Sequence, residues 1–265
     1  MKIREILSII SGIKQQNKSV VTNYYYSYNT SDCEFDVWQE KGAIVFCIRE
    51  NDVYRAFFYT NDKNTLIELL KKLPKDTVID YLSKDEEDQA EWMNEAGFDL
   101  YNVLSRMSNG DLKTVPKAQT KREKILEELY DPSFGEFATL DDCDEILSLL
   151  YEVFDYRVSR LPSKEELQEM ILKNWVLLYR LDNKIISFLI YKIEGKKYYG
   201  YQIYNEGTAD ITYNLERRAL QYAIENYGVT SSYAWVEIRN KGANKRVGAT
   251  ADGLLDYIYV KQEDK

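Results

Sequence analysis

The sequence contains no histidine, and this absence limits the chemistry open to the protein. Histidine is the usual base in Ser-His-Asp and Cys-His catalytic groups, so neither arrangement can form. Any general base must be a glutamate, an aspartate, a tyrosine, a lysine or a bound water. The absence also argues against a zinc site, because the remaining soft ligands are three scattered thiols.

Cysteine is scarce as well: Cys33, Cys47 and Cys143 lie far apart and form no Cys-x-x-Cys pair. An odd number of scattered thiols is typical of a reducing compartment. A catalytic thiolate needs an activating partner, and the chain has no histidine to serve as one. We therefore expect none of the three cysteines to be a nucleophile.

Long apolar runs are missing too. The first sixteen residues, MKIREILSIISGIKQQ, carry charge at Arg4 and Glu5 before a short apolar stretch. That stretch is too short to span a bilayer or to resemble the core of a signal peptide. We expect an amphipathic first helix and a cytoplasmic protein.

Negative charge exceeds positive charge, with 44 acidic against 35 basic side chains and a net charge of −9. An acidic surface repels nucleic-acid phosphates and anionic membranes, so neither is an expected partner. A small-molecule ligand fits better, and the sequence leaves an oligomer open. A ligand with phosphates would need a local basic groove or a set of backbone N–H groups.

Hydrophobic periodicity and capping signals divide the chain into two halves with a similar order of elements. The predicted domains are 1–112 and 133–265, joined by a linker helix within 113–132 and separated at Asp131-Pro132-Ser133. In the first half the pattern predicts helices at 2–16, 64–73 and 85–96 and strands at 19–28, 33–40, 43–49, 53–60, 77–82 and 98–107. The linker helix is expected at 117–130. In the second half it predicts helices at 142–153, 164–173, 214–226 and 240–250 and strands at 134–138, 175–181, 185–193, 197–205, 232–238 and 254–260.

Tyrosine is abundant, with 23 residues, and many lie in the predicted strands. Aromatic residues pack well on a pleated surface, so half-buried sheet positions explain them. An aromatic-lined cleft is the alternative.

Several segments resemble the GNAT superfamily of acetyltransferases. FATLDDCDEILSLLYEVF is similar to the opening strand and helix of that fold, and WVLLYRLDNKIISFLIYKIEG is similar to its second and third strands. In the first half, AEWMNEAGFDLYNVLSRM resembles its closing helix, turn and last strand. The resemblance implies an α/β protein of the α+β type, with two GNAT-like domains that each hold a mixed central sheet flanked by helices.

The resemblance also implies acyl transfer from acetyl-CoA, or another acyl-CoA, to a small amine or amino acid. In such enzymes the fourth and fifth strands splay apart, and the thioester lies in the gap between them. The family's Gln/Arg-x-x-Gly-x-Gly/Ala loop holds the pyrophosphate with backbone N–H groups at a helix N-terminus. Here the expected loop at 206–213 and helix at 214–226 put Asn214 and Glu216 where the glycines would be. The first half has Thr60, Asn61, Asp62 and Lys63 at that place.

The same resemblance assigns candidate roles to eleven residues. The catalytic candidates are Glu237 and Tyr204, the first as a base near the strand splay. The candidates for substrate binding are Arg157, Arg160 and Tyr201. The candidates for cofactor binding are Ile203, Tyr213, Asn214, Arg217, Arg218 and Asn240. A strand position facing solvent is the alternative for Glu237, and a helix cap is the alternative for Asn240.

Two other functions stay open from the sequence. The altered phosphate loop is also what a non-catalytic GNAT-like ligand-binding or regulatory protein would show. Tandem GNAT-like halves without the glycine motif also occur in aminoacyl-transferring enzymes of peptidoglycan bridges. The acidic composition argues against that second alternative, because such enzymes need a basic surface for tRNA.

Overall fold

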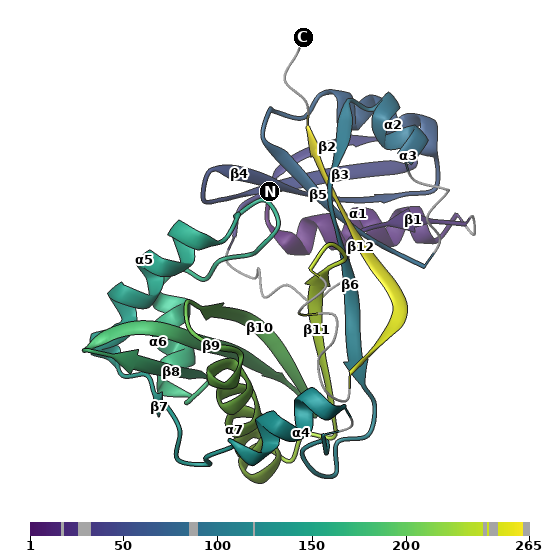
Figure 1. Ribbon diagram of the computed structural model, residues 1–265. Coiled ribbons are helices and arrows are strands. Elements are labelled where there is room, and N and C mark those ends of the chain that lie inside the picture. The colour runs from purple at the N-terminus through teal and green to yellow at the C-terminus, as the bar shows by residue number, and fades with distance from the viewer. Residues whose placement is uncertain are drawn as a thin grey trace. The chain divides into compact units, whose positions relative to one another are not determined.

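The computed structural model describes residues 1–16, 19–25, 33–84, 90–118, 120–240, 243 and 249–261 (Figure 1). The chain forms two compact units. Unit 1 comprises the described residues of Met1–Leu104, Tyr156–Val158 and Leu254–Lys265, and unit 2 those of Ser105–Asp155 and Ser159–Gly253. Each unit is a mixed sheet flanked by helices, so the predicted fold class is confirmed. Among the described residues, no helix has the length and apolar character needed to cross a membrane.

Unit 1 has the strand order β2-β3-β4-β5-β12-β6, with β1 pairing β4 off this path. Its strands are β1 (Val21–Thr22), β2 (Asp36–Glu40), β3 (Ala43–Glu50), β4 (Val53–Thr60), β5 (Thr77–Ser83), the first part of β6 (Phe98–Asn109) and most of β12 (Thr250–Lys261). Its helices are α1 (Ile3–Lys14), α2 (Lys63–Lys71) and α3 (Ala90–Glu95).

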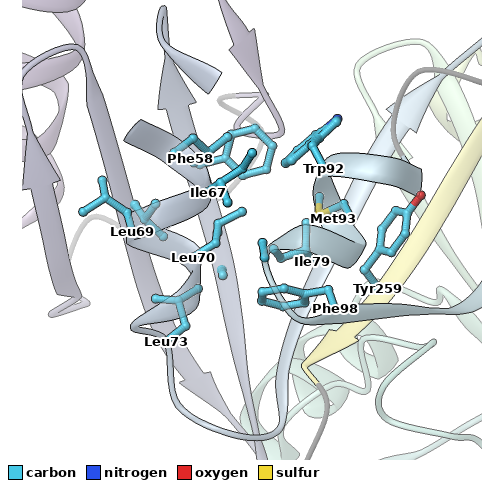
Figure 2. Packing of buried hydrophobic residues seen from close by; sticks show 14 of the residues in the cluster. Phe58, Ile67, Leu69, Leu70, Leu73, Ile79, Trp92, Met93, Phe98 and Tyr259 are labelled. Carbon is cyan, nitrogen blue, oxygen red and sulfur yellow. The ribbon is translucent and has the colours of Figure 1, made fainter. Parts of the chain in front are cut away.

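The core of unit 1 forms where α2 and α3 cover one face of this sheet (Figure 2). Leu66, Leu69 and Leu70 recur at helical spacing on α2 and are at most 1% exposed, which is the pattern of a helix face packed on a sheet. Trp92 of α3 meets the ring of Phe58 edge to face, with 5.8 Å between the ring centroids. On the other face, α1 packs its isoleucines against β3 and β4.

Unit 2 has the strand order β6-β11-β10-β9-β8-β7. Its further strands are β7 (Glu136–Phe137), β8 (Val176–Leu181), β9 (Lys184–Glu194), β10 (Lys197–Asn205) and β11 (Ser231–Glu237). Its helices are α4 (Lys121–Glu128), η1 (Leu140–Asp142), α5 (Cys143–Val153), α6 (Lys164–Leu172) and α7 (Ala209–Tyr227).

Strand β9 is buried on both faces, because Phe188, Leu189, Ile190 and Tyr191 are each at most 1% exposed. Leu189 and Tyr191 belong to a cluster with the apolar side of α7, and we call this side of the strands the α7 face. Helix α5 also contacts β9 and lies on the other side of the strands from α7 (Figure 1). We call that side the α5 face; Phe188 and Ile190 point to it because side chains alternate along a strand.

Several predicted boundaries differ from the structure. Helix α7 starts at Ala209 rather than at 214, so the predicted loop at 206–213 was wrong over most of its length. Helix α4 starts at Lys121, after a capping box between Thr120 and Glu123. Of the predicted strand at 19–28, Val21–Thr22 pair with β4, and 26–28 lie outside the described residues. The starts of the predicted helices at 85–96 and 240–250 also fall mostly outside them.

The last strand lies elsewhere than the predicted domain limits suggest. Residues 255–260 of β12 pair antiparallel with β5, inside unit 1, although the sequence assigned them to the second half. Strands β6 and β12 each contribute residues to both units. Each unit is therefore completed by strand residues from the other half of the sequence.

The cysteines give a simple test of burial. Burial raises the pKa of the Cys47 thiol to about 12 and also raises the pKa of Cys143, whereas Cys33 is partly exposed. At about pH 8, where a free thiol begins to ionise, iodoacetamide is expected to label Cys33 in the native protein. Mass spectrometry should find Cys47 and Cys143 labelled only after denaturant is added; fast native labelling of either would contradict this packing.

Candidate functional site

Unit 2 contains a gap between two parallel strands. Strands β10 and β11 pair from Lys197 opposite Ser231 to Gly200 opposite Ala234. Both strands continue beyond this point, to Asn205 and Glu237, and Figure 1 shows them diverging. Beyond Gly200 and Ala234 the described residues of the two strands form no further pair, and we call this stretch the gap.

A β-bulge lies at the start of this gap. Gly200 pairs with Tyr191 of β9 and Gln202 pairs with Ile190, so Tyr201 is the extra residue. The register therefore brings Tyr199, Gln202 and Tyr204 to the α5 face and Ile203 to the α7 face. Bulges re-aim side chains and end regular pairing, and both happen here.

A pocket of about 110 Å³ adjoins the gap on the α7 face. Small residues, Gly200, Ser232 and Ala234, line it at the paired ends of β10 and β11. Its other walls are mostly apolar, and they come from β6, the linker, β9, β10 and α7: Met107, Val115, Pro116, Leu189, Ile203 and Leu220. Glu216 and Arg217 of α7 also line this pocket, and its mostly apolar walls suit an uncharged part of a ligand.

The N-terminus of α7 follows directly from β10. The Asn205 side chain accepts a hydrogen bond from the Gly207 N–H at 3.1 Å and donates to the Gly207 and Thr208 carbonyls, which shapes the turn. Thr208 is the N-cap residue, and within the described part of the chain its side chain makes no capping hydrogen bond. The first-turn N–H groups of a helix have no acceptor inside the helix, so this end can receive an anion.

The corresponding gap in unit 1 is filled by the protein itself. Strands β4 and β5 are parallel and pair only at Tyr54–Thr77 and Arg55–Val78. Further along, β1 pairs with the free edge of β4. The buried Asn23 then joins both strands: its amide donates to the carbonyls of Ala56 and Asp80 at 2.9 and 3.1 Å, and its oxygen accepts from the Phe58 N–H at 2.7 Å.

The helix that follows β4 is also capped internally. Asp62, the N-cap residue of α2, accepts hydrogen bonds from the N–H groups of Asn64 and Thr65 at 3.1 and 3.3 Å. A carboxylate at this position occupies the donors that a phosphate would need, and its charge repels one. In unit 1, therefore, Asn23 bridges the two parallel strands and Asp62 caps the following helix, whereas the described residues of unit 2 show neither contact at β10, β11 and α7.

Replacing Asn23 with alanine should destabilise the protein. The change leaves the Phe58 N–H and two carbonyls without their buried partner, and each such loss costs about 1–3 kcal/mol. Chemical denaturation should show a loss of at least about 2 kcal/mol. The exposed Asn226, whose amide bonds only its own helix at Tyr222, provides the control. Equal stability of Asn23→Ala and Asn226→Ala would show that Asn23 does not hold the two strands.

Three of the six cofactor candidates line the pocket: Ile203, Tyr213 and Arg217. Two hydrogen bonds hold the Arg217 side chain in place: its guanidinium donates to the Pro116 carbonyl at 2.8 Å and to the Glu127 carboxylate at 3.2 Å. It also lies over the Tyr213 ring, 5.3 Å from the centroid. Its position is therefore fixed by the linker and α4.

The other three cofactor candidates make contacts within the fold. Asn214 is 1% exposed, accepts from the Asp131 N–H and donates to the Asp210 carbonyl. Arg218 donates to the carbonyls of Ser133, Phe134 and Gly135. Both side chains thus form hydrogen bonds that link residues 131–135 to α7. Asn240 accepts from the N–H of Ala243 at 3.0 Å, and the residues on either side of Ala243 lie outside the described ones.

The catalytic candidates lie on the α5 face. Tyr204 is buried against Phe188, with ring centroids 5.2 Å apart, and burial together with the nearby Glu206 carboxylate raises the pKa of Tyr204 to about 12. Its hydroxyl therefore stays protonated at neutral pH. Glu237 ends β11 and is exposed. It lies four residues after Tyr233, so strand alternation puts both on the same face.

The three substrate-binding candidates do not all belong to the same unit. The Tyr201 hydroxyl donates a hydrogen bond to the Arg160 carbonyl, which joins β10 to the loop before α6. Arg157 belongs to unit 1, where it pairs with Asp76 at 3.7 Å and lies over the Tyr101 ring. The predicted loop thus contributes Arg160, but not Arg157, to the part of unit 2 that holds Tyr201.

Sequence reasoning missed the small residues that open the pocket, Gly200, Ser232 and Ala234, and the turn at Gly207. A signal was present. A glycine inside a tyrosine-rich strand is unusual and marks a bulge or a close approach. A Cβ on Gly200 would stand 3.4 Å from the Cβ of Ala234. The strands therefore meet here closely before they part.

No family model and no curated protein matches the sequence. Solved structures do match. One is a GCN5-related N-acetyltransferase from Sphaerobacter thermophilus, at 12% identity and TM-score 0.54, over 82% of this chain and 76% of that one. A second, from Kribbella flavida, aligns at 12% identity and TM-score 0.53 over 100% of this chain and 97% of that one. A third, described as a GNAT-family acetyltransferase from Novosphingobium aromaticivorans, aligns at 11% identity and TM-score 0.51 over 83% and 89%.

The chain thus has the fold of the GCN5-related N-acetyltransferases. At these identities the likeness concerns the fold alone, and a fold of this kind can host different functions. The function has to be argued from the gap, the pocket and the helix end of unit 2.

Proposed function

We propose that unit 2 is an N-acyltransferase that takes an acyl group from acetyl-CoA, or another acyl-CoA, and transfers it to a small amine or amino acid. The observation that supports this most is the gap between β10 and β11, which adjoins a pocket lined by small and apolar residues. Unit 1 closes the same gap with Asn23 and the same helix end with Asp62. The protein is therefore expected to bind one acyl-CoA per chain.

The residues of unit 2 fit the thin arm of an acyl-CoA. Gly200 and Ala234 leave the strand edges accessible, while Leu189 and Ile203 supply an apolar wall for the methylene groups. The turn at Gly207 and the first turn of α7 would hold the phosphates through N–H groups, with Arg217 as the cation in the pocket wall. When bound, the acyl-CoA supplies an activated thioester.

The α5 face would then receive the amine. Glu237 lies on the part of β11 that has separated from β10, and we assign it the role of accepting the proton that the amine loses. Tyr204 remains protonated at neutral pH, so its hydroxyl can donate a proton to the departing thiolate but cannot act as the base. Backbone N–H groups freed by the bulge at Tyr201 would polarise the acyl carbonyl.

An acyl-transfer assay tests this function. The full-length protein is incubated with acetyl-CoA and a panel of primary amines and amino acids, and thiol release and product mass are followed. We expect Glu237→Gln to lower kcat by about 10²–10⁴-fold, the usual contribution of a general base, while acetyl-CoA binding is kept. No binding of acetyl-CoA or of another acyl-CoA at millimolar ligand would rule out the proposal.

A non-catalytic ligand-binding role is the second candidate, and the phosphate loop favours it. That loop has one glycine, Gly207, and Asp210 adds a negative charge to the first turn of α7. A carboxylate there weakens phosphate binding. Acetyl-CoA binding without turnover across the whole panel would support this role over catalysis.

A further inference from the structure

A cluster of aromatic residues surrounds one lysine on the α5 face of unit 2. Lys192 of β9 pairs in register with Tyr199 of β10, which pairs with Tyr233 of β11. These three residues form one row across three strands. The Tyr199 and Tyr233 rings are stacked, with centroids 4.6 Å apart, and Tyr201 meets Tyr199 edge to face at 5.6 Å.

The Lys192 ammonium lies over the Tyr201 ring, 3.7 Å from its centroid. Within the described parts of the chain it forms no ion pair with a carboxylate. Burial lowers the pKa of Lys192, the carboxylates of Glu166 and Glu194 oppose this effect, and Arg160 adds to it. The Lys192 side chain is thus a half-buried cation whose charge is only partly balanced by the groups around it.

The surrounding groups are held in place. The Tyr233 hydroxyl donates to the Glu194 carboxylate at 2.6 Å, so this acid is already engaged. Tyr201 is fixed by its hydrogen bond to the Arg160 carbonyl. A half-buried ammonium is costly without a paired anion, and a cation–π contact offsets only part of that cost. A ligand anion would complete the environment of Lys192.

We propose that Lys192 binds an anionic group, a carboxylate, of the acceptor, with Tyr199 and Tyr201 packing against the acceptor's carbon skeleton. The inference rests on the proposed acyl transfer, because it places the acceptor on the α5 face beside the gap at Tyr201. It narrows the acceptor from small amines in general to amino acids and other amines that carry a carboxylate. Tyr199 and Tyr201 both remain partly exposed, so a ligand can reach the cluster.

The test uses pairs of compounds that differ by one carboxylate: phenylalanine and phenethylamine, arginine and agmatine, lysine and cadaverine. Binding of their N-acetyl forms to the protein, with and without CoA, is measured by calorimetry, and kcat/KM is measured for the free amines. In at least one pair the carboxylate form should be favoured by about 10- to 100-fold, the value of one charge-assisted contact.

Variants separate the role of Lys192 from general damage. Lys192→Met is expected to abolish the carboxylate preference, since it removes the charge and keeps an unbranched chain, and Lys192→Arg should keep most of it. Lys197→Met, at an exposed position on β10, is the control and should change nothing. Thermal unfolding confirms that each variant is folded.

Each result is decisive for this proposal. A preference that survives in Lys192→Met, or that no pair shows, would overturn the carboxylate site. Acetyl-CoA binding measured in the same samples keeps the two proposals apart. Acetyl-CoA binding without a carboxylate preference contradicts only the role of Lys192. A carboxylate preference that depends on Lys192, seen without acetyl-CoA binding, upholds the anion site and contradicts acyl transfer.

Discussion

Ser232→Leu is expected to weaken acetyl-CoA binding by roughly 100-fold, or about 2.8 kcal/mol. Ser232 lines the pocket together with Gly200 and residues of α7, and leucine would place a branched side chain in a cavity of about 110 Å³. The overlap falls where the thioester arm is proposed to lie. The dissociation constant from isothermal calorimetry checks this directly.

Ser231 offers a matched control on the same strand. It directly precedes Ser232, is partly exposed like Ser232, and does not line the pocket. Ser231→Leu should therefore bind acetyl-CoA with nearly the affinity of the original protein. Equal affinity of the two variants would show that the ligand does not enter this pocket.

Arg55→Met should destabilise the protein by about 3–5 kcal/mol, which is the usual cost of removing one partner of a buried ion pair. Arg55 is 2% exposed and lies in unit 1. Its guanidinium donates to both carboxylate oxygens of Asp80, at 3.1 and 3.3 Å, and to the carbonyls of Tyr156 and Arg157, at 2.7 and 3.1 Å. Methionine leaves all of these acceptors without their donor.

Lys71→Met is the corresponding control for a surface ion pair. Lys71 pairs with Glu68 at 2.7 Å, but both side chains are exposed, and exposed pairs contribute little to stability. Urea denaturation should separate the two variants clearly. If Arg55→Met unfolded at the same urea concentration as Lys71→Met, the buried network around Arg55 would not stabilise unit 1.

The order of elements was predictable because periodicity and turn residues are local signals. Leu66, Leu69 and Leu70 identify α2, and Ser163 with Glu166 marks the start of α6. The start of α7 was harder, because Asn214 resembles a cap residue in sequence. In the fold Asn214 instead bonds Asp131, a contact 83 residues away that no local pattern reveals.

Contacts between residues far apart in the sequence also could not be predicted from local sequence patterns. The alternation in β12 marks a strand but does not say that its neighbour is β5 rather than a strand of its own half. The closure of unit 1 depends on Asn23, whose role emerges only when two strands converge on it. Of the predicted cofactor residues, Ile203, Tyr213 and Arg217 line the pocket, and their role in binding stays a prediction. Arg218 and Asn214 form hydrogen bonds with residues near the start of the second half. Their charge and polarity alone could not identify these partners.

A calorimetric titration of the full-length protein with acetyl-CoA tests the central claim most directly. Because the gap in unit 1 is filled by Asn23 and the gap in unit 2 is open, we predict one binding site per chain, strongly weakened by Ser232→Leu and kept in Ser231→Leu. No binding at millimolar acetyl-CoA, two sites per chain, or one site that Ser232→Leu leaves unchanged would contradict it.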